Sequence, residues 1–150
     1  MAAHDYEPVV RTVTVQAPIE KAFRVFTEDM GTWWPFEPHS IGKDKVVDAA
    51  IEGRAGGRIY EKWADGTTCD WGEVIVFDAP AKLVLSWKPN PDSSAPTEVH
   101  ISFMPRGSST EVRLEHRGWE RLGDEAGPAR DSYTSGWVVV MDRFEARFAA

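Results

Sequence analysis

Cysteine is almost absent from this chain of 150 residues, which has only Cys69. One thiol excludes an internal disulfide framework and favours a reducing compartment. No apolar run approaches the roughly 20 residues that a membrane-spanning helix needs. Residues 1–8 also lack the apolar core of a signal peptide. We therefore expect a cytoplasmic protein.

Basic charge is scarce as well. Lys and Arg number 17 against 24 Asp and Glu, a net charge of −7 with no basic run. This balance argues against nucleic acid or an anionic membrane as the partner. No CxxC, HxxxH or acidic calcium loop occurs, nor a glycine-rich phosphate loop after a strand or a nucleophile elbow. We predict no metal and no cofactor.

Aromatic residues are abundant, with seven Trp and seven Phe. Each can bury roughly 150–250 Å², and a chain of this length is large enough for one domain with a real core. There is no internal repeat or linker, so we expect residues 1–150 to form a single domain, with residues 1–8 irregular.

The last stretch, residues 128–148, predicts a long amphipathic helix. Its apolar residues recur at steps of three and four and form one stripe: Tyr133, Gly136, Trp137, Val140, Met141, Phe144 and Phe148. Charged residues occupy the opposite side. Such a helix needs a sheet to cover its apolar face.

Short alternating segments precede this helix. Strands are predicted at 9–16, near 45–52, and at 58–63, 70–77, 83–87, 98–104 and 111–117. Pro18 suits the first position of a short helix that ends near Asp29, and a turn of helix with irregular chain follows in 30–41. The order predicts an α+β fold with an antiparallel sheet.

The last hairpin allows its register to be predicted. Pairing positions that sum to 215 places apolar residues opposite each other on one face: Val99 with His116, Ile101 with Leu114 and Phe103 with Val112. The other face is then charge-matched.

A second hairpin predicts a carboxylate inside the protein. Simple alternation in 70–77 places Trp71, Glu73, Ile75 and Phe77 on one inward face. A two-residue loop at Asp65-Gly66 would set Arg58 opposite Glu73 and Tyr60 opposite Trp71. A three-residue turn at 79–81 would set Phe77 opposite Leu83 and Ile75 opposite Leu85. Glu73 is then either a structural partner of Arg58 or a polar anchor or acid/base group.

Several segments resemble one known family when they are taken together in this order and spacing. They are residues 13–23 (VTVQAPIEKAF), Gly56-Gly57-Arg58-Ile59, Gly66 with Trp71-Gly72-Glu73-Val74, Pro80 with residues 83–87, and Gly136-Trp137. The chain resembles, over residues 9–148, the START-like SRPBCC superfamily, in the branch of homologues of the activator of the heat-shock-protein-90 ATPase.

The resemblance implies a helix-grip fold. A curved antiparallel sheet of about six to seven strands would wrap the long C-terminal helix, with short helices after the first strand and an apolar cavity between sheet and helix. Members bind lipids, polyketides, plant hormones and other hydrophobic molecules, and a minority are cyclases, aromatases or hydrolases.

Strand alternation, the helix stripe and the irregular aromatic segment after the first short helix give a set of candidate ligand-binding residues: Trp33, Trp34, Tyr60, Trp71, Glu73, Trp87, His116, Tyr133, Trp137 and Met141. Trp137 is a cavity wall or a plain core aromatic. Trp33, Trp34 and Phe36 cap the cavity or plug a gap. His116 is a hydrogen-bond donor at the wall or a satisfied core residue.

We expect a protein that binds a small hydrophobic or aromatic molecule in this cavity, as a monomer or homodimer. One alternative is an enzyme of the cyclase, dehydratase or hydrolase type that uses Glu73 or His116 as acid/base. The other is a chaperone-associated interaction module of the stress response. It predicts an apolar patch on the outer face of the sheet.

Overall fold

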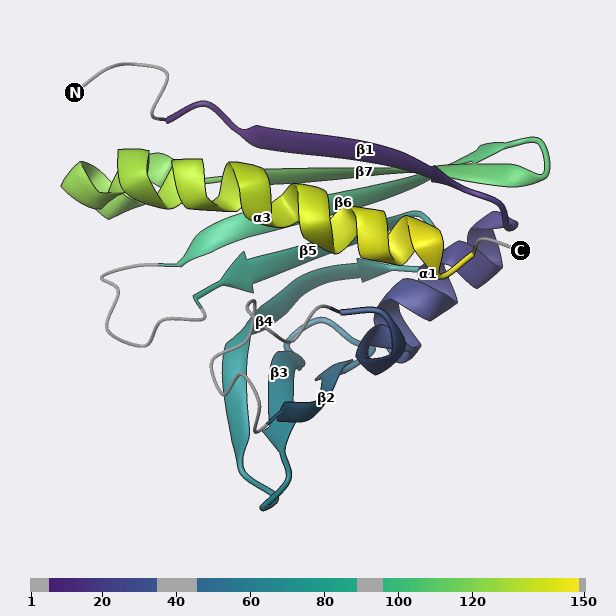
Figure 1. The fold of residues 1–150 in the computed structure, drawn as a ribbon, viewed down its shortest axis with the longest axis horizontal. Coiled ribbons are helices and arrows are strands. Elements are labelled where there is room, and N and C mark those ends of the chain that lie inside the picture. The colour runs from purple at the N-terminus through teal and green to yellow at the C-terminus, as the bar shows by residue number, and fades with distance from the viewer. Residues whose placement is uncertain (1–5, 35–45, 89–95, 149–150) are drawn as a thin grey trace.

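The structure, a computed structural model, describes residues 6–34, 46–88 and 96–148, so Phe36 lies outside the described residues. Its elements follow in this order: β1 (Val9–Val15), α1 (Ile19–Glu28), the 3-10 turn η2 (Met30–Thr32), β2 (Val46–Ile51), β3 (Arg58–Trp63), β4 (Thr68–Asp78), β5 (Lys82–Trp87), β6 (Thr97–Arg106), β7 (Ser109–Arg117), the 3-10 segment η4 (Trp119–Glu125) and α3 (Ala126–Ala146) (Figure 1).

Seven strands form one antiparallel sheet in the order β1-β7-β6-β5-β4-β3-β2. The sheet curls, and α3 lies lengthwise against it beside β1 (Figure 1). This is the helix-grip α+β architecture that the resemblance implies, so the predicted fold class is confirmed.

The predicted stripe on α3 is confirmed. Trp137, Val140, Met141 and Phe144 are buried, while Tyr133 is half-buried. The helix begins at Ala126, two residues before the predicted start. The segment η4 before it was not predicted from the sequence, and it places Trp119 in the core.

The register predicted for the last hairpin is also confirmed. Val99 pairs with His116 and Ile101 with Leu114, as in the sum of 215. The inner face is buried. On the outer face the ion pairs run along the strands as well as across them, for example from Arg113 to Glu115 at 3.1 Å.

Helix α1 packs phenylalanine side chains near the C-terminal end of α3. The Phe26 ring lies 5.1 Å from both the Trp33 and Phe144 rings, centroid to centroid. Phe23 meets Phe77 at 5.2 Å. Pro18 is the residue before the helix rather than its first residue. Edge-on aromatic pairs of this kind stabilise a core beyond the area they bury.

Strand β4 departs from simple alternation at two points. Ile59 pairs with Gly72 and Tyr60 with Asp70, which leaves Trp71 without a partner of its own on β3. A second irregularity lies at Ile75, between Val74 and Val76. Each extra residue shifts the side chains that follow to the other face.

The two bulges overturn three predictions. Glu73 and Ile75 do not face inward but are exposed, and the buried positions after Trp71 are Val74 and then, in part, Phe77. Tyr60 lies opposite Asp70 instead of Trp71. The three-residue turn is confirmed, and it sets Phe77 opposite Leu83, but Leu85 pairs with Val74 rather than with Ile75.

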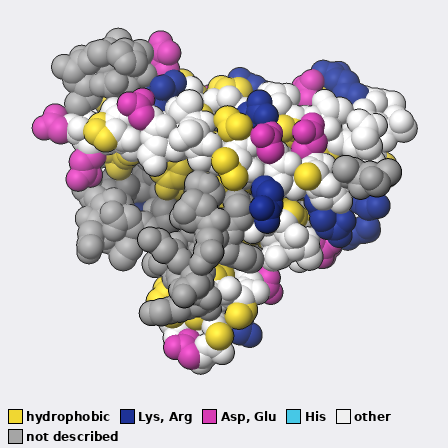
Figure 2. All heavy atoms as spheres, viewed as in Figure 1, with side chains coloured by type: hydrophobic (Ala, Val, Ile, Leu, Met, Phe, Trp, Pro, Cys, Tyr) yellow, Lys and Arg dark blue, Asp and Glu magenta, His cyan; other side chains and the backbone are white. Residues whose placement is uncertain are grey.

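The side of the molecule in Figure 2 carries both signs of charge over α3, with single apolar side chains between them. Among the described residues, no helix is long and apolar enough to cross a membrane.

Gly72 should tolerate no side chain. A methyl group there would lie 1.8 Å from the backbone oxygen of Ser86, which belongs to the neighbouring strand. We expect Gly72→Ala to lower the free energy of unfolding by about 3 kcal/mol, the upper end of overpacking effects. Urea unfolding measures this change.

Gly53→Ala is the matched control, because its new methyl group would make an ordinary 3.5 Å contact with the Phe77 ring. It should change stability by no more than about 0.5 kcal/mol. Equal effects of the two variants would contradict the close approach of β4 and β5 at Gly72.

Candidate ligand-binding site

Three tryptophans from different elements converge between sheet and helix. Trp71 comes from β4, Trp87 from β5 and Trp137 from α3. The ring centroids of Trp71 and Trp87 are 5.8 Å apart, and those of Trp87 and Trp137 are 5.2 Å apart. We call these three side chains the indole walls. All three belong to the set that the sequence predicted.

Each indole wall is held by a hydrogen bond from its ring N–H. Trp71 Nε1 donates to Glu61 Oε1 at 2.7 Å, Trp87 Nε1 to the Tyr133 hydroxyl at 3.1 Å, and Trp137 Nε1 to His116 Nδ1 at 2.9 Å. A buried N–H without an acceptor costs roughly 1–3 kcal/mol. The three acceptors therefore fix the position and the orientation of the three indole rings.

Glu61 is the inward carboxyl group that the sequence reasoning missed. It lies on β3 with no exposed surface, and its second oxygen accepts a 2.6 Å hydrogen bond from Trp63 Nε1. The alternation of Ile59, Glu61 and Trp63 could have revealed it. Simple alternation in β4 pointed to Glu73 instead, because it did not include the bulge at Trp71.

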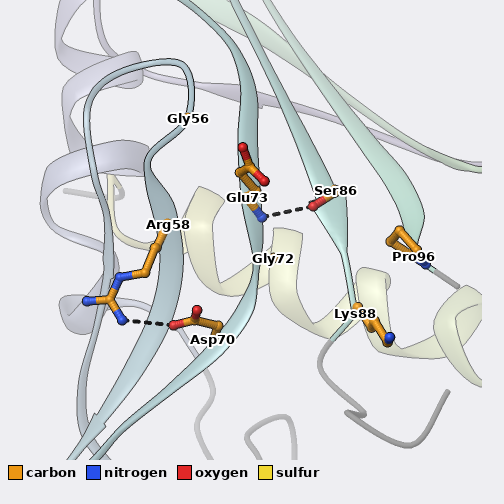
Figure 3. A pocket seen from close by; sticks show the side chains of 8 residues that line it. All are labelled: Gly56, Arg58, Asp70, Gly72, Glu73, Ser86, Lys88 and Pro96. Atoms are coloured by element: carbon orange, nitrogen blue, oxygen red, sulfur yellow. Dashed lines mark hydrogen bonds and ion pairs between the residues drawn. The ribbon is translucent and has the colours of Figure 1, made fainter.

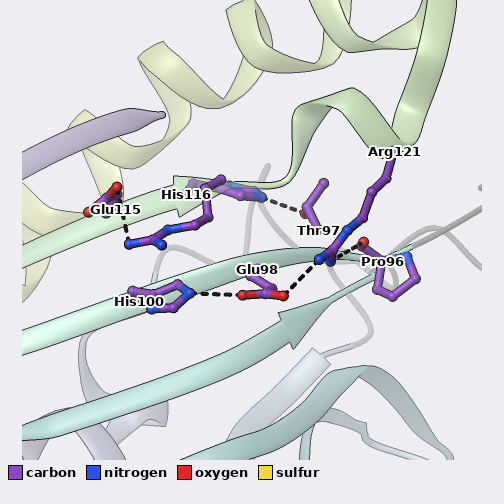
Figure 4. Close-up of polar contacts among 8 residues, drawn as sticks. Pro96, Thr97, Glu98, His100, Glu115, His116 and Arg121 are labelled. Carbon is purple, nitrogen blue, oxygen red and sulfur yellow. Dashed lines mark hydrogen bonds and ion pairs between the residues drawn. The ribbon is translucent and has the colours of Figure 1, made fainter. Parts of the chain in front are cut away.

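His116 is a satisfied core residue, one of the two predicted alternatives. An indole N–H can only donate, so Nδ1 accepts and the neutral ring carries its proton on Nε2. Nε2 then donates to Thr97 Oγ1 at 2.6 Å (Figure 4), and that hydroxyl donates to the Trp87 carbonyl at 3.2 Å. Burial lowers the pKa of His116 to about 3. The imidazole thus links helix to sheet and is no acid/base group near neutral pH.

Tyr133 lies at the edge of this group and is half-buried. Its ring stacks on Trp137 with centroids 6.0 Å apart. Burial raises the pKa of its hydroxyl, so the group keeps its proton at neutral pH. Among the described residues no acceptor takes this proton, and the hydroxyl can donate to a bound molecule.

Two predicted residues lie on the other side of the sheet. Glu73 faces outward, and its backbone N–H donates to Ser86 Oγ at 2.9 Å (Figure 3). Tyr60 packs under the Arg58 guanidinium, 4.2 Å from its ring centroid. Arg58 does pair with Glu73 in the strand register, as predicted, but the predicted ion pair between them is not formed, and the Arg58 guanidinium bonds to Asp70 at 2.9 Å. Glu73 lines an open hollow of about 440 Å³ on this outer face.

The remaining predicted residues are Trp33, Trp34 and Met141. Met141 is fully buried in the core beneath α3. Trp34 lies among the indole walls and leaves only 5% of its surface accessible. Among the described residues, the Trp34 ring therefore occupies the space between the three indole walls.

The described residues offer no group of three His, Cys, Asp or Glu side chains close enough to hold a metal ion. The site is thus built from aromatic faces, one buried carboxyl group and one phenolic hydroxyl. These groups can enclose a flat apolar molecule and orient it by hydrogen bonds.

The burial of His116 should make stability depend on pH. The folded protein keeps this ring neutral, whereas the unfolded chain binds a proton below pH 6.5. Stability is therefore present above pH 6.5 and is lost as the pH falls toward 3, by about 1.4 kcal/mol per pH unit. We expect His116→Gln to reduce this slope in urea unfolding measured across that range. Equal slopes in the two proteins would contradict the assignment.

Comparison with known proteins gives one family. The family model described as Activator of Hsp90 ATPase homolog 1-like protein matches residues 16–149. The comparison with curated proteins gave no match.

Among solved structures, the anthrahydroquino-Gama-pyrone synthase Txn09 is 31% identical, with coverage of 93% of this chain and 96% of that chain and a TM-score of 0.60. The self-sacrificing resistance protein CalC from Micromonospora echinospora is 27% identical, with coverage of 96% and 95% and a TM-score of 0.70. The Aha1 dimer from Colwellia psychrerythraea, at 19% identity, coverage of 94% and 95% and a TM-score of 0.67, shares the fold. The chain therefore belongs to the family of Activator of Hsp90 ATPase homolog 1-like proteins.

Proposed function

We propose that this protein binds a small hydrophobic or aromatic molecule against the indole walls, between the sheet and α3. The observation that carries the proposal is the set of three hydrogen bonds on Trp71, Trp87 and Trp137. Any buried indole needs an acceptor, and here the acceptors stand on β3, α3 and β7, so they also fix how the three aromatic faces are turned toward one another. Walls whose orientation is fixed in advance lose little entropy when a ligand arrives.

The polar groups around the walls have separate roles in this proposal. His116 and Glu61 hold walls and do not need to touch the ligand. Tyr133 holds Trp87 and also has a proton to donate. It would orient a ligand that carries a carbonyl or phenolic oxygen. Trp33 and Met141 are buried in the core and do not need to touch the ligand.

The energetics favour a modest affinity for a small flat ligand. A flat ligand that buries about 250 Å² of apolar surface would gain on the order of 6 kcal/mol, and each stacked aromatic pair adds roughly 0.5–1.5 kcal/mol. The loss of translational and rotational freedom offsets part of this gain. The similarity to a synthase and to a resistance protein is compatible with ligands of small size.

The walls can be tested with 1-hydroxyanthraquinone, a flat tricyclic molecule with one phenolic and two carbonyl oxygens. Trp137→Phe keeps an aromatic ring but shortens one wall and removes its bond to His116. We expect at least tenfold weaker binding, which corresponds to about 1.4 kcal/mol. Titration calorimetry, with intrinsic tryptophan fluorescence as a second readout, measures the change.

Phe103→Leu is the control, because Phe103 is buried and its ring packs against Phe23 and Phe26 rather than against a wall. Its affinity should stay within about twofold of the wild-type value. If the parent protein binds neither this probe nor other flat aromatics, or if Trp137→Phe binds as tightly as the parent, the proposed function is wrong.

A second candidate is an enzyme that works at the same walls. It is favoured by the 31% identity to a synthase and by the carboxyl group of Glu61 beside Trp71. The two acid/base residues suggested by the sequence do not support it. Glu73 is on the outer face, and burial lowers the pKa of His116 to about 3, so that its ring does not take up a proton near neutral pH. For any turnover found, Glu61→Gln should lower kcat at least a hundredfold. Turnover unchanged by that substitution would remove Glu61 from consideration.

The distribution of exposed apolar side chains gives little support to the chaperone-associated alternative. It calls for a contiguous apolar patch. The exposed large apolar side chains among the described residues are instead distributed over several elements: Tyr6 before β1, Val10 on β1, Val47 on β2, Ile75 and Val76 on β4, Met104 on β6, and Val138 and Val139 on α3.

A further inference from the structure

Trp34 lies among the indole walls but belongs to none of the elements that carry them. Its ring centroid is 4.8 Å from Trp71, 6.2 Å from Trp87 and 6.1 Å from Trp137. It is held by the chain just after η2, outside any helix or strand, with its backbone N–H bonded to the Met30 carbonyl at 3.0 Å. The walls come from β4, β5 and α3, so one side chain from a separate segment fills the space between them.

The adjacent tryptophan has a different environment. Trp33 Nε1 donates to the Val25 carbonyl of α1 at 3.1 Å. Its ring packs against Phe26 at 5.1 Å and Phe144 at 4.9 Å. Trp33 therefore joins α1 to α3 as part of the phenylalanine core. Both indoles are buried, but the Trp33 ring packs among the phenylalanines and the Trp34 ring packs among the indole walls.

The walls do not need Trp34 to keep their positions. The hydrogen bonds that fix them go to Glu61, Tyr133 and His116. Without the Trp34 ring, the three walls would still surround a space the size of an indole. Apolar cavities of this kind stay dry and bind flat aromatic molecules.

We propose that the Trp34 side chain occupies the ligand's place in the unliganded protein and thereby determines which ligands can bind. This inference rests on the proposed function. A ligand must displace the indole and reproduce its contacts, which are a tilted ring contact to Trp71, at 39° between planes, and an edge contact to Trp137, at 83°. A fused bicyclic or larger aromatic has that shape, and an alkyl chain does not.

Competition with Trp34 lowers the apparent affinity of every ligand. Only the fraction of molecules whose indole has left the space can bind, and the apparent Kd rises in proportion. Removal of the ring should thus tighten binding of a flat aromatic while leaving the walls unchanged. Trp34 would therefore favour ligands whose aromatic contacts with the walls are stronger than those of the indole that they displace.

The test compares Trp34→Ala with Trp33→Ala, using 2-naphthol as a bicyclic probe and decanoate as an alkyl probe in titration calorimetry. We expect Trp34→Ala to bind 2-naphthol at least tenfold more tightly than the wild type, without such a gain for decanoate. Trp33→Ala also creates a cavity, but in the core, and should show no gain. Trp34→Leu replaces Trp34→Ala if the latter does not fold.

A second measurement follows Trp34 in the wild-type protein labelled with 5-fluorotryptophan, its ¹⁹F resonance assigned with Trp34→Phe. Addition of 2-naphthol should shift the Trp34 signal strongly and that of Trp33, whose ring lies 5.9 Å from Trp34, to a smaller extent. The inference is overturned if the parent binds 2-naphthol with an unchanged Trp34 signal, or if Trp33→Ala gains as much as Trp34→Ala. Absence of aromatic binding in both the parent and Trp34→Ala would overturn the proposed function as well.

Discussion

The arrangement of this protein depends on one constraint: an indole N–H that is taken out of water needs an acceptor. Trp71, Trp87 and Trp137 meet that constraint with three chemically different groups, a carboxyl, a phenol and an imidazole. Each acceptor stands on a different element from its donor, on β3, α3 and β7. The hydrogen bonds therefore join β3 to β4, and α3 to both β5 and β7. The same bonds that stabilise the fold also orient the aromatic faces of the candidate site.

His116 illustrates how a polar residue in a core can have a structural role. Its two ring nitrogens connect the helix, through Trp137, to the start of β6, through Thr97. This pattern admits a single neutral tautomer, and burial explains why the pKa of the imidazole is so low. These two hydrogen bonds explain why a histidine lies on an apolar strand face, and the explanation needs no catalytic role for it.

Periodic parts of the chain were predictable because their side chains repeat with the geometry of the backbone. The α3 stripe has a helical period, and the β6–β7 hairpin pairs apolar with apolar positions in a single register. The residue range of strand β4 was predictable, but the face of the sheet on which each of its side chains lies was not. Its bulge at Trp71 is set by the partner strand and by the close approach of Gly72 to Ser86, neither of which alternation reveals. Glu73 was for this reason predicted in place of Glu61, and Tyr60 was predicted to face inward.

The amino-acid sequence by itself determined the strands, the two α-helices, their order and most of the aromatic residues that gather under α3, because hydrophobic spacing is a local property of the chain. The family was indicated separately, by the resemblance of short segments in a fixed order. Only the tertiary structure decided which carboxyl group is buried, which acceptor each indole uses, and that Trp33 and Trp34 have different surroundings. Those features depend on side chains from elements distant in sequence, and on one-residue shifts in strand pairing that move a side chain from one face of the sheet to the other.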